Sequence, residues 1–325
     1  MPKTATMEHW IITNRTIVRR RPGEGRLTEV VSGGEGQPLP TFRIMRFTPP
    51  DPVQASNTGA LDKAAELVPD EDLRDDSAYS RLSLDDDPAM LRASRAMLLS
   101  LYRALRSGRD VLVLIPDAGH DWPGSIGVLH EMHRAFAGLE RESPLLVLFS
   151  VPTVENLRGR WSDQRIARTS GQVLGRVFAK AVAFLEQIVD PQVVSSGSVH
   201  LLAEGFGAVI LAEACGAIQG VPELERPILN GVHLVRPDLT PDALAPKGVL
   251  APLRMLARHA SVVIDPAGSL DVEKKTLGTH GPRTEQPMVV PVTVHEPAGT
   301  PSLSATQVLR LIGESAPGQR AFRSG

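Results

Sequence analysis

The residues with the clearest chemical meaning lie at 199–211, where an apolar strand-like run, a sharp glycine turn and an apolar helix-like run follow one another. At such a turn the pattern Gly-x-Ser-x-Gly exposes a serine hydroxyl, and the next backbone N–H helps to bind the oxyanion of an acyl-transfer reaction. This chain reads Ala-Glu-Gly-Phe-Gly at 203–207, with Gly205 where the serine would stand. Because glycine adopts positive φ angles at little steric cost, the sequence predicts that this glycine turn is kept without its nucleophile.

Two acidic residues could supply other chemistry near the glycine turn. Glu204 immediately precedes Gly205, and Asp117 follows the apolar run 111–115. If both strands end at the same edge of a parallel sheet, the two carboxylates could divide acid and base roles between them. The alternative is that Glu204 caps the following helix, whose N-terminus favours negative charge. We favour the capping role.

Three histidines and an aspartate between positions 120 and 133 could in principle bind a metal ion. His130 and His133 lie three residues apart in a predicted helix, with His120 and Asp121 before it. This spacing is not the His-Glu-x-x-His pattern of zinc proteases, and neither a phosphate-binding loop nor a dinucleotide-binding glycine pattern joins a strand to a helix. We therefore predict no metal and no cofactor, and interpret the two histidines as exposed or partly buried helix residues.

From residue 88 onward, predicted helices alternate with predicted strands, and these elements must position the residues described above. Their apolar strands are uninterrupted, which indicates burial on both faces. The alternation predicts an α/β fold with a doubly wound, mainly parallel sheet and right-handed crossovers. Helices are expected at 90–105, 126–139, 163–189, 207–218, 249–259 and 304–314, and strands at 111–115, 145–149, 199–203, 231–235, 261–264 and 288–294.

The N-terminal part has a different pattern. Two short strand-like runs, 10–13 and 41–47, precede a stretch at 48–87 that is rich in Pro, Asp, Ser and Glu. The runs predict a hairpin or edge strands added to a larger sheet, and the polar stretch predicts a loop or linker. We accordingly divide the chain into an N-terminal extension (1–87), a main domain (88–314) and a flexible tail (315–325).

Composition restricts the class of protein. The formal net charge is −2 and the pI is about 6.5, so nucleic-acid binding has no electrostatic support. Cys215 is the single cysteine, and its apolar neighbours predict a small buried helix residue. No apolar run reaches about 18 residues and no secretion signal is evident, which predicts a cytoplasmic protein without a membrane span.

Several segments match a family pattern in order and spacing. They are the strand opening at 110–115, Phe149-Ser150-Val151-Pro152-Thr153 where the family reads F-S-W-P-S, the regions 162–163 and 167–170, the glycine turn, and Arg236-Pro237-Asp238 where the family reads A-P-D. Through them the chain, from about Asp110 to Glu314, resembles a bacterial α/β-hydrolase family of uncharacterised function. The resemblance implies a sheet of the α/β-hydrolase type.

The family's catalytic positions are lost when they are carried over residue by residue. The nucleophile becomes Gly205, the acid falls at Gly268, and the histidine falls at Thr300. A shifted alignment would restore a carboxylate at Asp265 or Asp271. His295 is the only histidine near the place expected for the catalytic one, and no histidine follows it.

The loop that would bind the oxyanion is altered as well. Where the family reads H-G-F-N, this chain has Pro116, Asp117, Ala118 and Gly119. An aspartate puts negative charge where a developing oxyanion needs hydrogen-bond donors, each worth about 2.7–4 kcal/mol. The resemblance and these losses together argue against the serine-hydrolase mechanism.

The sequence thus predicts a pseudoenzyme that acts through protein binding or as a structural or regulatory subunit, with a protein partner or a second copy. Two alternatives stay open: an esterase-like hydrolase with a displaced catalytic group, and a small-ligand sensor that uses the former active site. We also expect Gly205→Ser to fold with little or no esterase activity. The former active-site pocket is predicted to consist of Pro116, Asp117, Ala118, Glu204, Gly205 and Phe206.

Overall fold

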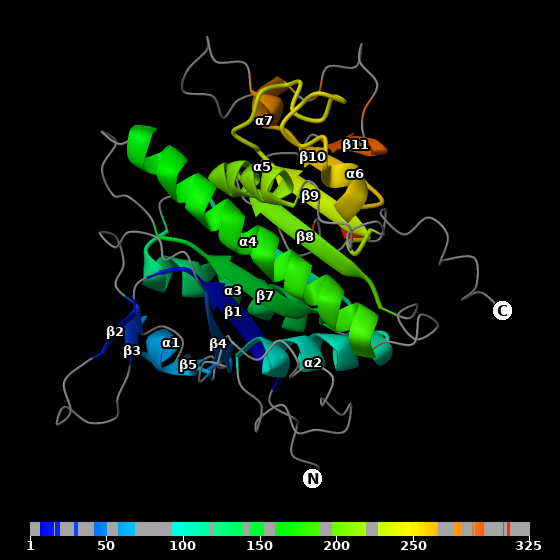
Figure 1. Ribbon diagram of the computed structural model, residues 1–325. Coiled ribbons are helices and arrows are strands. Elements are labelled where there is room, and N and C mark those ends of the chain that lie inside the picture. Colours follow the sequence, from blue (N-terminus) through cyan, green and yellow to red (C-terminus); the bar gives the residue numbers. More distant parts are fainter. Residues whose placement is uncertain are drawn as a thin grey trace.

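Within the part of the chain that the structure describes, nine strands form one sheet and two short strands form a separate ribbon (Figure 1). The structure is a computed structural model. It describes residues 7–15, 17–19, 29–31, 42–50, 58–68, 93–117, 120–138, 143–152, 160–188, 197–218, 227–265, 276–280, 282, 288, 290–295, 308 and 311–312.

The main sheet is mostly parallel. Neighbouring strands from β11 to β1 all pair in parallel, while β4 pairs antiparallel with both β1 and β5. The predicted α/β fold class is therefore confirmed. The strand order is β11 (Val292–His295), β10 (Ala260–Val263), β9 (Gly231–Val235), β8 (Val199–Glu204), β6 (Val111–Ile115), β7 (Leu145–Ser150), β1 (His9–Thr13), β4 (Arg43–Phe47) and β5 (Ala65–Leu67).

Helices cover both faces of this sheet. One apolar cluster joins the sheet to α2 (Ala93–Arg106), α4 (Arg160–Ile188) and α5 (Phe206–Ala217). A second cluster joins the opposite face to α1 (Thr58–Ala64) and α3 (Trp122–Ala137). In Figure 1, α4 and α5 lie together in front of the sheet, and α3 lies behind it. The short elements β2 (Ile17–Arg19), β3 (Glu29–Val31), α6 (Leu253–Leu256) and α7 (Leu277–His280) complete the described set.

The strands at the centre are apolar on both faces because each face meets a helix layer. In β6, Leu112 and Leu114 belong to one cluster while Val111 and Ile115 belong to the other. Such alternation follows from the two-residue period of a strand. Gly207 lets α5 approach β6 closely, because a Cβ atom there would overlap the Ile115 carbonyl oxygen.

The N-terminal part joins the main sheet more deeply than the sequence predicts. The expected hairpin exists, since β1 and β4 pair antiparallel, but β1 lies inside the sheet between β7 and β4. The prediction of a loop at 48–87 is wrong for 58–67, which form α1 and β5. Leu61 is buried in the apolar cluster against the sheet. This contact stabilises α1 although the composition of the stretch is mostly polar. Residues 51–57 and 69–87 lie outside the described residues.

Two predicted elements near the C-terminus are shorter in the structure. The helix expected at 249–259 reduces to α6, because Ala257 adopts an extended backbone and bridges to Leu229. The last strand begins at Val292 rather than at 288. Most of the helix expected at 304–314 and the whole tail at 315–325 lie outside the described residues, and the proposed domain boundaries stay predictions.

Two predictions from composition bear on the described elements. Cys215 lies in α5 and is fully buried, as expected, and burial raises the pKa of its thiol to about 12. The thiolate required for reactivity is thus disfavoured there. None of the helices in the described ranges is at once long and apolar enough to cross a bilayer.

Candidate functional site

The carboxyl ends of β6 and β8 lie side by side where the chain changes its direction of travel across the sheet. From β6 the chain passes through α3 to β7 on one side, and from β7 it passes through α4 to β8 on the other. Ligands of open parallel sheets bind outside the strand ends at such a switch point. The end of β6 leads into Pro116 and Asp117, and the end of β8 leads into Gly205.

Gly205 makes the sharp turn from β8 into α5. Its φ of 51° and ψ of −115° lie in a region that side-chain-bearing residues rarely adopt. Its N–H donates to the Val235 carbonyl at 2.9 Å, and its own carbonyl accepts from the Asp238 N–H at 3.2 Å. The turn is therefore fixed by the neighbouring strand β9 and the segment after it.

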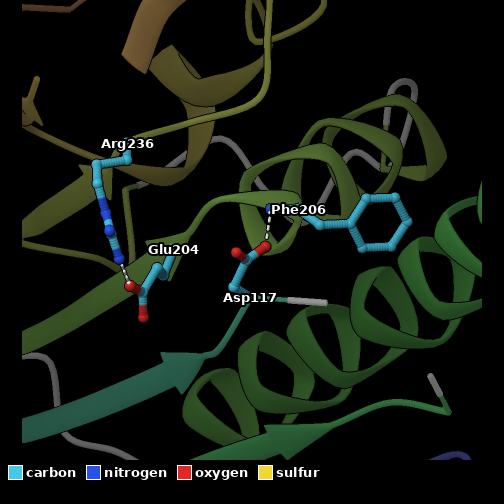
Figure 2. A network of polar contacts seen from close by, with 4 residues as sticks. All are labelled: Asp117, Glu204, Phe206 and Arg236. Carbon is cyan, nitrogen blue, oxygen red and sulfur yellow. Dashed lines mark hydrogen bonds and ion pairs between the residues drawn. The ribbon is translucent and has the colours of Figure 1, made fainter. Parts of the chain in front are cut away.

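The carboxylate of Asp117 fills the space above Gly205. A Cβ atom at position 205 would overlap this carboxyl group. Its Oδ1 atom accepts a hydrogen bond from the Phe206 N–H at 2.7 Å (Figure 2). That N–H is the one that would stabilise an oxyanion at a nucleophile-bearing turn. In this chain it already serves an internal carboxylate.

This contact changes two expectations. Gly205 has no free room for a side chain, so the expectation that Gly205→Ser folds conflicts with the position of Asp117. The residue that binds the N-terminus of α5 is Asp117, since α5 has no cap bond from its own N-cap side chain. A carboxylate at this end of a helix is favoured by the exposed N–H groups and the macrodipole.

Glu204 pairs with Arg236, which enters the sequence predictions only as part of the family pattern. The Arg236 Nη2 atom donates to Glu204 Oε1, in an ion pair whose side chains are 34% and 24% exposed. Glu204 lies opposite Val235 in the β8–β9 register, so Arg236 follows its direct neighbour. The favoured role of Glu204 as a helix cap is therefore wrong, and no bond between Glu204 and Asp117 is present at this turn (Figure 2).

Arg236 also has an uncommon backbone. Its φ is 45°, and it is the only residue other than glycine with a positive φ among those described. Its N–H donates to the Val263 carbonyl at 2.8 Å, which continues the pairing toward β10. A left-handed arginine is strained by about 1–3 kcal/mol and persists where surrounding contacts fix it. Here the contacts include the ion pair to Glu204.

The structure describes only some of the positions that the resemblance assigns to the catalytic acid and histidine. Ala118, Gly268, Asp271 and Thr300 lie outside the described residues. Asp265 follows β10, and its N–H donates to the Gly278 carbonyl at 2.8 Å. His295 ends β11, three strands from β8, which places the two backbones about 14 Å apart at a strand spacing of about 4.8 Å. Five residues of the predicted pocket, Pro116, Asp117, Glu204, Gly205 and Phe206, do meet at one turn, and their functional role stays a prediction.

The helix histidines of α3 form protein contacts. His133 Nδ1 lies 2.9 Å from His9 Nε2, and His9 Nδ1 accepts the Leu146 N–H at 3.1 Å. His9 must therefore carry its proton on Nε2 and donate it to His133. Burial, reinforced by His133 and Arg109, lowers the pKa of His9 well below its usual value, which favours this neutral form.

The other members of the suggested metal group have separate partners. His130 is buried and packs edge-on against Phe47 with ring centroids 6.5 Å apart, so the expectation of an exposed or partly buried side chain is wrong for it. The Asp121 carboxylate caps α3 by accepting the Gly124 N–H at 2.8 Å, and the His120 carbonyl accepts from Arg15. In the described ranges, no three His, Cys, Asp or Glu side chains are grouped to hold a metal ion.

Sequence reasoning missed His9 and Arg15, and it named Arg236 without its contact to Glu204, although all three make important polar contacts in the fold. Each lies at the start of a strand or just beyond its end. For Arg15 and Arg236, the available signal was an arginine one or two residues after an apolar strand, at the edge where parallel-sheet ligands bind. The sequence pattern does not give the register of the strands, and that register determines which side chains lie next to these arginines.

Comparison of the chain with protein-family models, with curated proteins and with solved structures found no match. The functional argument therefore depends on the geometry of these turns.

Proposed function

We propose that this chain is a non-catalytic protein on an α/β-hydrolase-like scaffold, and that it acts through binding, as a protein-binding or regulatory subunit. The observation that supports this most is the Asp117 carboxylate, which lies over Gly205 and accepts the Phe206 N–H. An acyl-transfer site needs that space for a nucleophile and that donor for an oxyanion. Here both are taken by one internal carboxylate.

The scaffold assignment is supported by topology and by the sequence resemblance together. Parallel strands β7, β6, β8, β9, β10 and β11 follow one another around a switch point, and the sharp turn comes directly after β8. In hydrolases that use a strand-to-helix nucleophile turn, the nucleophile occupies the corresponding position at the top of the sheet. Gly205 occupies it in this chain.

Electrostatics argue in the same direction. An oxyanion that approached the Phe206 N–H would meet the negative charge of Asp117 at short range, where like charges repel strongly. Loss of a single oxyanion donor costs about 2.7–4 kcal/mol of transition-state stabilisation. The proposal therefore predicts that acyl transfer at this turn is suppressed even if a substrate reaches it.

A fluorophosphonate probe and a panel of acyl esters test the absence of catalysis. The wild-type chain, Asp117→Asn and Asp117→Ala should all remain unlabelled and show no turnover above the buffer rate. Serine nucleophiles form covalent adducts with such probes, so intact-mass spectrometry reports directly. Labelling or turnover that disappears when one serine is changed would overturn the proposal.

A second candidate is a hydrolase that uses Asp117 itself as nucleophile, since carboxylates form covalent intermediates in several enzyme classes. The observation that favours it is the position of the carboxylate, in the space that a side chain at 205 would take. Attack by the Asp117 carboxylate on the acyl carbon of an ester would expel the alcohol and form a mixed anhydride, which water would cleave by attacking either of its two carbonyl carbons. Rapid-quench mass spectrometry of a single turnover would find the acyl group on the Asp117 peptide, and in ¹⁸O-labelled water, attack at the Asp117 carbonyl carbon would leave label there; the non-catalytic proposal predicts neither.

The binding role can be tested by position-specific crosslinking in the full chain. A photoreactive residue replaces the half-buried Phe206 at the carboxyl edge or, as a control, the exposed Ser107 before β6 at the opposite edge. We expect a specific crosslinked species, either with a second copy or with a host protein, from position 206 only. Identical patterns from both positions, or none from either, would contradict binding at this edge.

A further inference from the structure

A second polar turn lies at the same sheet edge, directly after β1. Arg15 comes two residues beyond Thr13, which pairs with Ser150 at the end of β7. The Arg15 side chain is fully buried, with 0% exposure. A buried guanidinium is uncommon because removing its charge from water is costly unless it is paired.

The hydrogen bonds of Arg15 use only part of its donor capacity. Nε donates to Ser150 Oγ at 3.0 Å, and Nη2 donates to the His120 carbonyl at 2.8 Å and to Ser125 Oγ at 3.2 Å. The guanidinium has five N–H donors, and these three bonds use one on Nε and two on Nη2. Both donors of Nη1 therefore remain unused. The buried Nη1 atom has no hydrogen-bond partner in the described structure.

Among the described residues, no carboxylate contacts Arg15 to neutralise its charge. Its three acceptors are two hydroxyls and a carbonyl, all neutral. Burial lowers the pKa of Arg15 to about 10, against the opposing effect of Asp121, so the group stays cationic near neutral pH. Asp121 itself caps α3 by accepting the Gly124 N–H. The N-terminus of this 16-residue helix adds further positive potential beside Arg15.

The residue next to Arg15 has unused hydrogen-bonding capacity as well. Asn14 is fully buried, and its Nδ2 donates to Ser170 Oγ at 2.9 Å. Its Oδ1 atom has no partner among the described residues. Two consecutive buried side chains thus leave polar atoms unsatisfied at the edge of a parallel sheet. Native interiors satisfy most such atoms, and the exceptions call for an explanation.

We propose that Arg15 binds the carboxylate or phosphate group of a small molecule at this turn. The Nη1 donors, the Ser125 hydroxyl and the N-terminal turn of α3 provide its anchor. Arginine is the residue best suited to such groups because its planar donors match their oxygen atoms. This anion site is separate from the glycine turn and does not depend on the proposed function.

Calorimetric titration of the full chain with sodium acetate and with inorganic phosphate, at constant ionic strength and pH 7.5, tests the site. Asp121→Asn is the informative variant, because asparagine keeps the helix cap while removing the nearby negative charge. We expect saturable 1:1 binding of at least one anion to the wild type, and severalfold tighter binding to Asp121→Asn. Binding of acetate alone identifies a carboxylate ligand, and binding of phosphate alone a phosphate ligand.

Two arginine variants locate the binding. Arg15→Met should abolish it, whereas Arg109→Met should retain it, because Arg109 uses Nε and Nη2 on the carbonyls of Ser143 and Pro144 at the opposite edge. If Arg15→Met does not fold, the titrations of the wild type and Asp121→Asn still decide the question. No saturable binding of either anion to these two proteins, or binding that persists in a folded Arg15→Met, overturns the proposal.

Discussion

The turns after β8 and after β1 lie at the same edge of the sheet, but their charged side chains differ in whether the described residues supply an opposite partner. At the glycine turn, the Asp117 carboxylate is bonded to the Phe206 N–H and Glu204 is paired with Arg236. At the Arg15 turn, the described residues offer the guanidinium only neutral acceptors and leave Nη1 without a partner. The chain thus fills the first turn with its own side chains, while the second retains donors for a ligand. A location typical of catalysis does not by itself identify the residue that binds.

The largest expected effect comes from adding a side chain at the filled turn. Gly205→Ala combines an unfavourable φ of 51° with overlap of the Asp117 carboxyl group, and should destabilise the protein by about 3 kcal/mol. Urea denaturation measures the change. In the double variant Gly205→Ala with Asp117→Ala, the steric part should be recovered and only the φ strain should remain. Equal stability of Gly205→Ala and wild type would show that the turn is not filled.

Proton uptake concerns buried histidines in the strands of the sheet, whose hydrogen-bond partners in the described structure are neither Gly205 nor Arg15. His9 and His233 are neutral when folded, since burial above all lowers the pKa of each well below its usual value. In the unfolded chain a histidine pKa is about 6.5, so the unfolded state gains protons first as pH falls. Stability should be complete above about pH 6.5 and fall below it, by at most about 1.4 kcal/mol per pH unit for each histidine.

Urea denaturation at pH 7.5, 6.5 and 5.5 measures this slope. The variant His9→Gln with His233→Gln is the control, and its stability should vary less between these pH values. A wild-type protein that becomes more stable on acidification from pH 6.5 would contradict the neutral, buried state of both histidines.

The capping contact of Asp117 has a smaller expected contribution. Asp117→Ala leaves the Phe206 N–H without its acceptor and should cost about 1 kcal/mol, as for other lost helix caps. Asp117→Asn keeps an acceptor oxygen in nearly the same shape and should cost less. Thermal denaturation of the three proteins separates these cases. If Asn proves more damaging than Ala, steric fit rather than the hydrogen bond governs the turn.

The smallest expected effect concerns the pair between Glu204 and Arg236. Both side chains are partly exposed, so Arg236→Ala should cost only about 0.5 kcal/mol. Arg236→Gly loses the same pair but relieves the φ of 45°, and should therefore be more stable than Arg236→Ala. The difference between the two variants, measured by urea denaturation, reports the backbone strain. The reverse order would show that the positive φ is not strained.

Much of the scaffold could be predicted from the sequence because its strands are buried on both faces. The apolar runs at 111–115, 145–149 and 231–235 each coincide with a strand to within one residue. The predictions of secondary structure failed where tertiary contacts override local composition. Leu61 orders α1 within a polar stretch, and the bridge from Ala257 to Leu229 ends a helix that periodicity alone would extend.

The site could be predicted only in outline. The sequence predicts that Gly205 stands where a nucleophile would be, and it places Asp117 in the loop after the run 111–115. That the Asp117 carboxylate lies over Gly205 depends on side-chain direction, and that Glu204 finds Arg236 depends on the β8–β9 register. Neither follows from spacing along the chain, because strands that are neighbours in the sheet are separated by whole helices in the sequence.

Amide hydrogen exchange at Phe206 tests the central claim most directly. The Phe206 N–H is at the start of α5, where a helix offers no backbone acceptor, and its partner is Asp117 at 2.7 Å. Exchange should be slow in the wild type and much faster in Asp117→Ala, with the amide of Ile210 unchanged within the same helix. Equal exchange of the Phe206 amide in both proteins would contradict an Asp117 carboxylate that fills the glycine turn.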